Sequence, residues 1–223
     1  MKNVRFLATL IGMTCSIILA AAPTGAQMGL FKASIDFADL AQLSREGLEL
    51  LKVNEYEVFL AQVGLGRADN AGKKAEEDLE KAERTLKAKE LDVKAAKAEE
   101  KAAKENQDAG RMAKAAAVLK TAQEGLKATK MLVKWKSKEV TARKAGVKKA
   151  KFAVQVSEAQ RDLARVSRLI SENVPAAQKY AIEAYEKKLK EKQSDYDRAT
   201  TAEERKILAA KKSKVEYDQI AKR

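Results

Sequence analysis

Apolar residues recur at alternating spacings of three and four through the middle of the chain. In residues 73–107 the repeat consists of Ala75, Leu79, Ala82, Leu86, Val93 and Ala96. A heptad repeat of this kind is typical of a helix that packs along one stripe against a second helix. Many of its positions are alanine, which permits close approach but buries little surface per layer. The pattern therefore predicts a long helix over residues 73–107.

A reversal and a second long helix are predicted to follow. Gly110 closes the turn-forming segment 106–110 and is expected to take a positive φ. The repeat then resumes at Ala115, Leu119, Ala122, Leu126, Thr129, Val133, Val140, Val147, Ala150 and Val154. After that its phase shifts to Phe152, Val156, Ala159, Leu163, Val166 and Ile170, which indicates a change of neighbour. A helix over residues 111–172 would be about 90 Å long at 1.5 Å per residue. The two helices make a predicted hairpin over residues 69–173.

Shorter helices are predicted before the hairpin. Residues 33–62 are the most apolar part of the chain after its first 30 residues, and they favour one or two short helices within a segment covering residues 27–68. Glycines at 64, 66 and 72, with Asp69 and Asn70 between them, predict a break between this segment and the hairpin. Its candidate docking residues, for a partner or for the end of a bundle, are Ile35, Phe37, Leu40 and Leu43.

A C-terminal helical region is predicted over residues 174–223. Pro175 suits the first turn of a new helix and biases the residue before it away from helix. Thr201 and Glu204 match a capping box, which predicts that a separate final helix begins there. Since no segment alternates in the manner of a strand, the expected fold class is all-α: an elongated antiparallel helical hairpin or coiled-coil bundle with long helices.

The first 26 residues have the three-part layout of a secretory signal peptide. A basic start precedes an uncharged apolar run over residues 6–22, and small residues follow as far as Ala26, where cleavage is expected. This predicts a periplasmic or secreted protein, with Gram-negative bacterial export. An uncleaved anchor is the alternative, because no charged residue lies between Arg5 and Lys32.

Composition narrows the chemistry. The 223 residues include no His, and the single cysteine, Cys15, lies inside the predicted signal peptide. Imidazole general bases, Ser-His-Asp triads and most zinc sites are therefore excluded. A glycine-rich phosphate loop is also missing from the sequence. We expect a protein that is not an enzyme and uses no cofactor or metal.

Positive charge is concentrated in one stretch. Residues 111–151 carry 13 Lys or Arg against two acidic residues, whereas residues 27–110 carry 14 against 18. In a hairpin, the acidic cluster at residues 76–83 would lie near basic residues 134–143 and neutralise part of the excess. The remainder is either a solvated helix face or a surface for anionic lipid, lipopolysaccharide or an acidic partner. The candidate residues are Lys127, Lys130, Lys134, Trp135, Lys136, Lys138, Arg143, Lys144, Lys148 and Lys149.

Trp135 is the only tryptophan, and it lies between two lysines. Two interpretations stay open. The ring either anchors the protein in a lipid headgroup layer or on a partner, or it packs within the hairpin as a large side chain. Nucleic acid is not expected as a partner despite the basic charge, because export would separate the two.

These features together resemble those of the Ala/Lys/Glu-rich coiled-coil spacers and hairpins of bacterial envelopes. Composition, signal and long helices are also similar to the Skp/OmpH type of periplasmic chaperone, although the small β-sheet body of that family has no predicted counterpart here. The length of the second helix, the apolar segment over residues 33–62 and the absence of catalytic motifs predict a non-enzymatic scaffolding protein of the cell envelope that docks to a larger assembly or self-associates. The alternatives are a holdase chaperone for unfolded envelope proteins and a peripheral binder of anionic envelope lipids through the basic helix.

Overall fold

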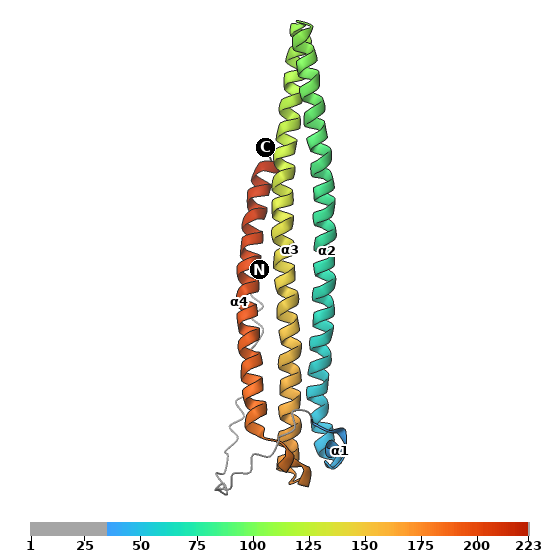
Figure 1. Cartoon of the computed structure of the whole chain (residues 1–223), viewed down its shortest axis with the longest axis vertical. Coiled ribbons are helices and arrows are strands. Elements are labelled where there is room, and N and C mark those ends of the chain that lie inside the picture. Colours follow the sequence, from blue (N-terminus) through green and yellow to red (C-terminus); the bar gives the residue numbers. More distant parts are fainter. Residues whose placement is uncertain (1–34, 223) are drawn as a thin grey trace, which may run out of the picture. The chain divides into compact units, whose positions relative to one another are not determined.

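The computed structural model describes residues 35–222, and these are almost entirely helical. The elements are α1 (Phe37–Leu40), α2 (Arg45–Glu105), α3 (Ala109–Ser171), the 3₁₀ helix η1 (Pro175–Lys179) and α4 (Ile182–Ala221) (Figure 1). The described part of the chain contains no strand, so the predicted all-α class is confirmed. The predicted signal peptide lies outside the described residues.

Three long helices pack in sequence order. α2 and α3 form an antiparallel hairpin, and α4 folds back along the other side of α3, which therefore lies between its two neighbours (Figure 1). α4 ends partway along α3, so that α2 and α3 continue beyond it as a two-helix arm. The predicted hairpin is thus present, and it forms part of a three-helix arrangement.

The tip of the hairpin differs in detail from the prediction. α2 ends at Glu105, and Gln107 takes the left-handed conformation with φ 51°. Asp108 then caps α3 by accepting a hydrogen bond from the amide of Arg111 at 3.0 Å. Gly110 already lies inside α3, so the prediction of a positive φ there is wrong. The reversal is shorter than expected because the aspartate side chain starts the second helix immediately.

The predicted break near residues 64–72 is also wrong, because α2 continues through all three glycines. Ser44 begins the helix by accepting a hydrogen bond from the amide of Gly47 at 3.0 Å. A Cβ on Gly72 would lie 3.6 Å from Val147 Cγ2, which places this glycine where α2 and α3 pack closely. Each interior glycine disfavours helix by about 1 kcal/mol relative to alanine. Packing of a 61-residue helix against α3 outweighs that local preference.

The C-terminal region contains one long helix where two were predicted. Pro175 begins η1 as expected, and Val174 before it is extended with ψ 129°. α4 then runs without interruption past Thr201, whose hydroxyl donates to the carbonyl oxygen of Asp197 at 3.1 Å. This bond stays within the helix and caps nothing, so the predicted capping box is wrong.

The largest buried side chains gather where α1, η1 and the adjacent ends of the long helices meet. The core consists of Leu40, Leu43, Leu51, Val166, Leu169, Val174, Ala176, Tyr180 and Tyr185. Towards the hairpin tip, the buried residues of α2 are mostly alanine and valine, ending at Ala103. Truncating a core leucine such as Leu169 costs about 2–5 kcal/mol, so this end is where the fold is stabilised most.

The shift in the apolar repeat of α3 has a structural cause. α3 packs on α2 along its whole length and on α4 only over the part that leads to η1, so its buried stripe widens and turns. Val156, Ala159 and Val166 are buried as the shifted repeat predicts. The last predicted member, Ile170, is exposed, and Leu169 takes the core position instead.

Candidate functional site

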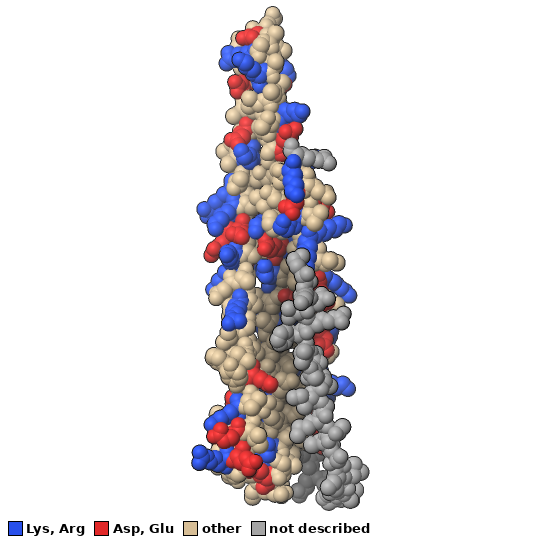
Figure 2. All heavy atoms as spheres, turned by 180° about the vertical axis from the view of Figure 1, so that it is seen from behind, with Lys and Arg blue, Asp and Glu red and all other residues tan. Residues whose placement is uncertain are grey.

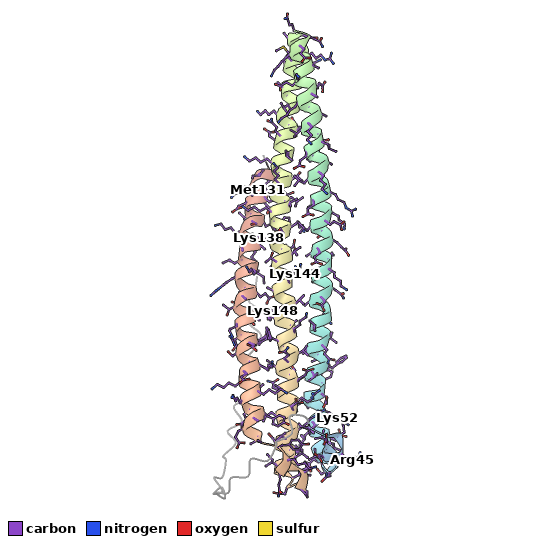
Figure 3. All side chains as sticks on the ribbon, viewed as in Figure 1. Arg45, Lys52, Met131, Lys138, Lys144 and Lys148 are labelled. Carbon is purple, nitrogen blue, oxygen red and sulfur yellow. The ribbon has the colours of Figure 1, made fainter. Side chains whose placement is uncertain are left out.

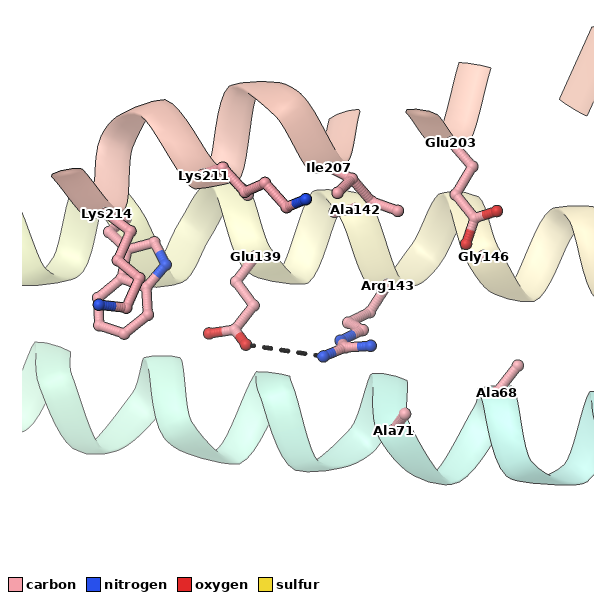
Figure 4. A pocket seen from close by; sticks show the side chains of 12 residues that line it. Ala68, Ala71, Glu139, Ala142, Arg143, Gly146, Glu203, Ile207, Lys211 and Lys214 are labelled. Carbon is pink, nitrogen blue, oxygen red and sulfur yellow. Dashed lines mark ion pairs between the residues drawn. The ribbon is translucent and has the colours of Figure 1, made fainter. Parts of the chain in front are cut away.

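A groove lies over α3 between α2 and α4. Its volume is about 450 Å³, and each of the three helices contributes small residues to its lining: Ala68 and Ala71 of α2, Ala142 and Gly146 of α3, and Ala210 of α4 (Figure 4). A second hollow of about 260 Å³ shares Gly146 and Glu203 with it and extends the groove along the same three helices. The surface is concave because the residues that would fill it carry one methyl group or none.

Small residues at helical spacing build the α2 wall of this groove. Ala61, Gly64, Ala68 and Ala71 follow one another at spacings of three, four and three, so that they share a face of α2. Sequence reasoning missed the groove, although this spacing was its signal. Gly64 within this series also predicts a helix break, and that prediction hides the continuous small-residue face of α2.

Trp135 and Tyr217 close one end of the groove. Their rings stack with centroids 5.6 Å apart and join α3 to the last turns of α4. The ammonium groups of Lys136 and Lys214 lie 4.5 Å and 5.3 Å from the centroid of the Trp135 ring. Trp135 is half-buried by these contacts, so it packs inside the three-helix body and also lines the groove.

Ion pairs line the same groove. Glu139 pairs with Lys136 at 2.9 Å and with Arg143 at 4.0 Å, the latter drawn in Figure 4. The ammonium of Lys149 donates to Glu203 of α4 at 2.8 Å. This hydrogen bond raises the pKa of Lys149. Burial lowers the pKa of Lys136, but hydrogen bonds to Glu139 and Asp78 outweigh it and leave that pKa raised. The groove is therefore apolar at its floor and charged at its edges.

The predicted basic surface is partly neutralised within the molecule. One of the expected hairpin pairs forms, Lys136 with Asp78 at 3.3 Å, and Lys144, one position beyond the predicted range, pairs with Glu76 at 2.9 Å. Lys134 instead pairs with Glu216 of α4 at 2.9 Å, a contact that the sequence did not reveal. Figure 2 shows Lys and Arg interspersed with Asp and Glu along the face in view, so that face is not of a single sign.

Four of the ten predicted residues are exposed lysines without a carboxylate partner among the described residues: Lys127, Lys130, Lys138 and Lys148. Lys138 and Lys148 are labelled in Figure 3, together with Lys144, whose pairing was described above. The basic surface predicted from ten residues is thus reduced to these four positions.

The predicted docking residues have different positions. Leu40 and Leu43 are buried in the molecule's own core, and Ile35 packs against it. Phe37 alone is open, with 81% of its surface exposed. A docking surface made of all four residues does not exist in this structure, because Leu40 of α1 and Leu43 of the turn after it are buried in the core with residues of α3 and η1.

Among residues 35–222, no cluster of three metal-ligating side chains occurs. None of the helices described is both long enough and apolar enough to cross a membrane. Comparison of the chain with models of protein families, with curated proteins and with solved structures finds no match.

Proposed function

We propose that the protein is a non-enzymatic scaffolding component of the cell envelope, exported by its N-terminal segment, that docks to a larger assembly. The observation that carries this proposal is the open groove over α3. Three long helices surround it as they would surround the fourth helix of a bundle. A partner helix laid in the groove would bury the small-residue face that this chain leaves uncovered.

The residues that line the groove determine which side chains a partner helix would need. Alanine and glycine walls let a backbone approach closely, so the facing stripe of the partner carries medium-sized apolar residues. The edges present Lys211 and Lys214 on one side and Arg143 on the other. Acidic residues flanking the apolar stripe of the partner would therefore favour binding and fix its direction.

The extended hairpin supports a spacing role. α2 and α3 contain 61 and 63 residues, and at 1.5 Å per residue each is about 90 Å long. Such a length exceeds what burial of a small core needs. A protein docked through the groove would project the tip of the hairpin far from its attachment point, which suits a component that holds other components apart.

The test is site-specific photo-crosslinking in the cells that make the protein. A benzoylphenylalanine replaces Ile207, which lines the groove, and the matched control replaces the next residue, Leu208, which is 70% exposed and outside the groove. We expect one dominant protein to be captured from position 207 and not from position 208. Mass spectrometry of the crosslinked peptide must then identify a helix with an apolar stripe.

Two other results would count against this proposal. A broad set of unrelated unfolded envelope proteins captured from position 207 would indicate a holdase chaperone instead. Equal capture from both positions would mean that the groove is not a binding site.

The four exposed lysines of the predicted basic surface that have no carboxylate partner within residues 35–222 favour a second candidate, a peripheral binder of anionic envelope lipids. Vesicles containing phosphatidylglycerol should bind the chain, and binding should weaken steeply with salt, since exposed charges are screened over about 10 Å at 0.1 M. Replacing Lys127, Lys130, Lys138 and Lys148 with Gln should abolish it. A control variant changes four exposed lysines of α2, namely Lys74, Lys87, Lys94 and Lys97, and should retain binding. Equal loss in both variants would leave only a general effect of net charge.

A further inference from the structure

A second apolar repeat runs along α2 on the side away from α3. Val53, Tyr56, Leu60 and Val63 follow one another at spacings of three, four and three, and we name these four residues the outer stripe. Because Leu51 and Val58 form the stripe that packs on α3, residues two and five positions later point to the opposite side of the helix. One helix thus carries two apolar seams on opposite faces.

Three of the four outer-stripe residues are exposed in the single chain, and the fourth, Val63, is half-buried. Val53, Tyr56 and Leu60 are 61%, 60% and 48% exposed, and Leu50 and Phe59 beside them are also exposed. The rings of Tyr56 and Phe59 stack at 6.3 Å on this surface. Neither α3 nor α4 reaches it, since α2 lies at one side of the three-helix arrangement (Figure 1). Scattered apolar residues on a surface are ordinary, but a heptad series of them is typical of a helix–helix interface.

Charged residues end the outer stripe in a self-complementary way. Glu49 lies four positions before Val53 and Arg67 four positions after Val63, so both continue the same spacing. Arg67 forms no ion pair with another described residue, and Glu49 pairs only with the neighbouring exposed Lys52. One end of the stripe is therefore negative and the other positive.

We propose that a second copy of this chain covers the outer stripe, antiparallel and related by a two-fold axis. In that arrangement Val53 meets Val63 of the partner subunit, and Tyr56 meets Leu60 of the partner subunit. Glu49 then lies against Arg67 of the partner subunit at both ends. A parallel pairing would set like charges against each other at both ends. The inference does not depend on the proposed function, because the groove is on a different face of α2.

A protein surface suits the outer stripe better than an anionic membrane. Glu46, Glu49 and Glu57 lie on or beside it and would be repelled by acidic headgroups. One of these glutamates disfavours the dimer, because Glu57 lies beside the two-fold axis and faces Glu57 of the partner subunit. The Glu57→Gln variant should therefore associate several-fold more tightly.

The decisive experiment is a charge exchange in the full chain, followed by sedimentation equilibrium. The wild type should sediment as a dimer at micromolar concentration, whereas Glu49→Arg and Arg67→Glu should each weaken the dimer at least tenfold. The double variant should restore it. The two positions are 18 residues apart, about 27 Å along one helix, so rescue cannot arise within a single chain. Single variants that remain fully dimeric, or a double variant that stays weak, would overturn the antiparallel register.

A second pair of variants tests whether the outer stripe is the interface at all. Leu60→Asp should give a monomer with unchanged helicity, since Leu60 contributes little to its own fold. Leu91→Asp is the control, because Leu91 is 63% exposed on the same helix and outside the stripe. A monomeric wild type, or dissociation by Leu91→Asp alone, would disprove the proposal. Neither variant alters the lining of the groove, so crosslinking from position 207 reports on the proposed function separately.

Discussion

Ser44 and Glu172 join the beginning of α2 to the end of α3. The amide and the hydroxyl of Ser44 donate hydrogen bonds of 2.7 Å and 3.0 Å to the two carboxylate oxygens of Glu172, although 128 positions separate the residues. The same hydroxyl oxygen accepts from the amide of Gly47. A single acidic side chain therefore fixes the position of one helix end relative to another, next to the largest buried side chains of the core.

This arrangement makes Gly47 sensitive to an added side chain. A Cβ at this position would collide with Oε1 of Glu172. Gly47→Ala should destabilise the protein by about 1 kcal/mol, because the loss of the Glu172 hydrogen bonds outweighs the better helix propensity of alanine. Gly66→Ala, where the added Cβ meets nothing within 4 Å, should stabilise it by up to about 1 kcal/mol. Urea denaturation followed by circular dichroism measures both, and a shift of the same sign in the two variants would contradict the account.

Tyr217 should hold the C-terminal turns of α4 against α3. Tyr217→Ala removes the stacking partner of Trp135 and should weaken this docking by about 1–2 kcal/mol. Because Trp135 is the only tryptophan, its emission should move to longer wavelength as the ring becomes wetter. Hydrogen exchange should accelerate over residues 205–221. Leu208→Ala, at an exposed position of the same helix, should change neither measurement.

Tyr180 should make stability depend on alkaline pH. Burial raises the pKa of its hydroxyl above the usual value, and its 2.6 Å hydrogen bond to Asp39 raises it further. A group with a raised folded pKa stabilises the fold fully below its unfolded pKa, about 10 for tyrosine. This stabilisation is lost as the pH rises through 10 towards the folded value.

The Tyr180→Phe variant isolates this effect. It should be about 1 kcal/mol less stable than the wild type at neutral pH, and the difference should shrink above pH 10. Other groups with raised pKa values, such as Lys149, titrate alike in both proteins and cancel from the comparison. A difference that stays constant from pH 8 to pH 11 would refute the role given to Tyr180.

The hairpin tip offers a separate test of backbone strain. Gln107 has φ 51° and Asn173 has φ 53°, both in the left-handed region. Asparagine tolerates this conformation better than glutamine, because its short side chain bonds locally. Gln107→Gly should therefore slow hydrogen exchange of residues 103–112 by the equivalent of roughly 1 kcal/mol, and Asn173→Gly should have a smaller effect at its own turn. Equal gains at the two sites would contradict this explanation.

The sequence predicted the parts of the fold that periodicity controls. The heptad repeats located the hairpin, because each helix buries one stripe of it against the other. Local signals failed where packing outweighed them, as at Gly72, which faces Val147, and at Thr201, whose hydroxyl bonds within α4. A glycine or a capping motif changes the free energy of forming a helix by about 1 kcal/mol. This is small beside the free energy gained when a long helix buries one face.

The site was less predictable than the fold. Lysine pairing with Glu76 and Asp78 followed from folding the hairpin back on itself, but the pairs of Lys134 and Lys149 depend on where α4 lies. The same holds for the groove, because its two sides come from α2 and α4 and its position also depends on where α4 lies. A surface made by three segments distant in sequence leaves only a partial local signal, such as the spacing of small residues in α2, and that signal does not show how the segments meet.

Because α4 ends before the hairpin of α2 and α3 does, the resistance of the molecule to bending differs along its length. Near η1 a bending load is shared by three helices and a core of large side chains, whereas beyond the Trp135–Tyr217 stack it is carried by two helices joined through alanine layers. Curvature will concentrate where the cross-section narrows. A sideways force on the Asp108 turn would therefore bend the molecule near the Trp135–Tyr217 stack, next to the end of the groove.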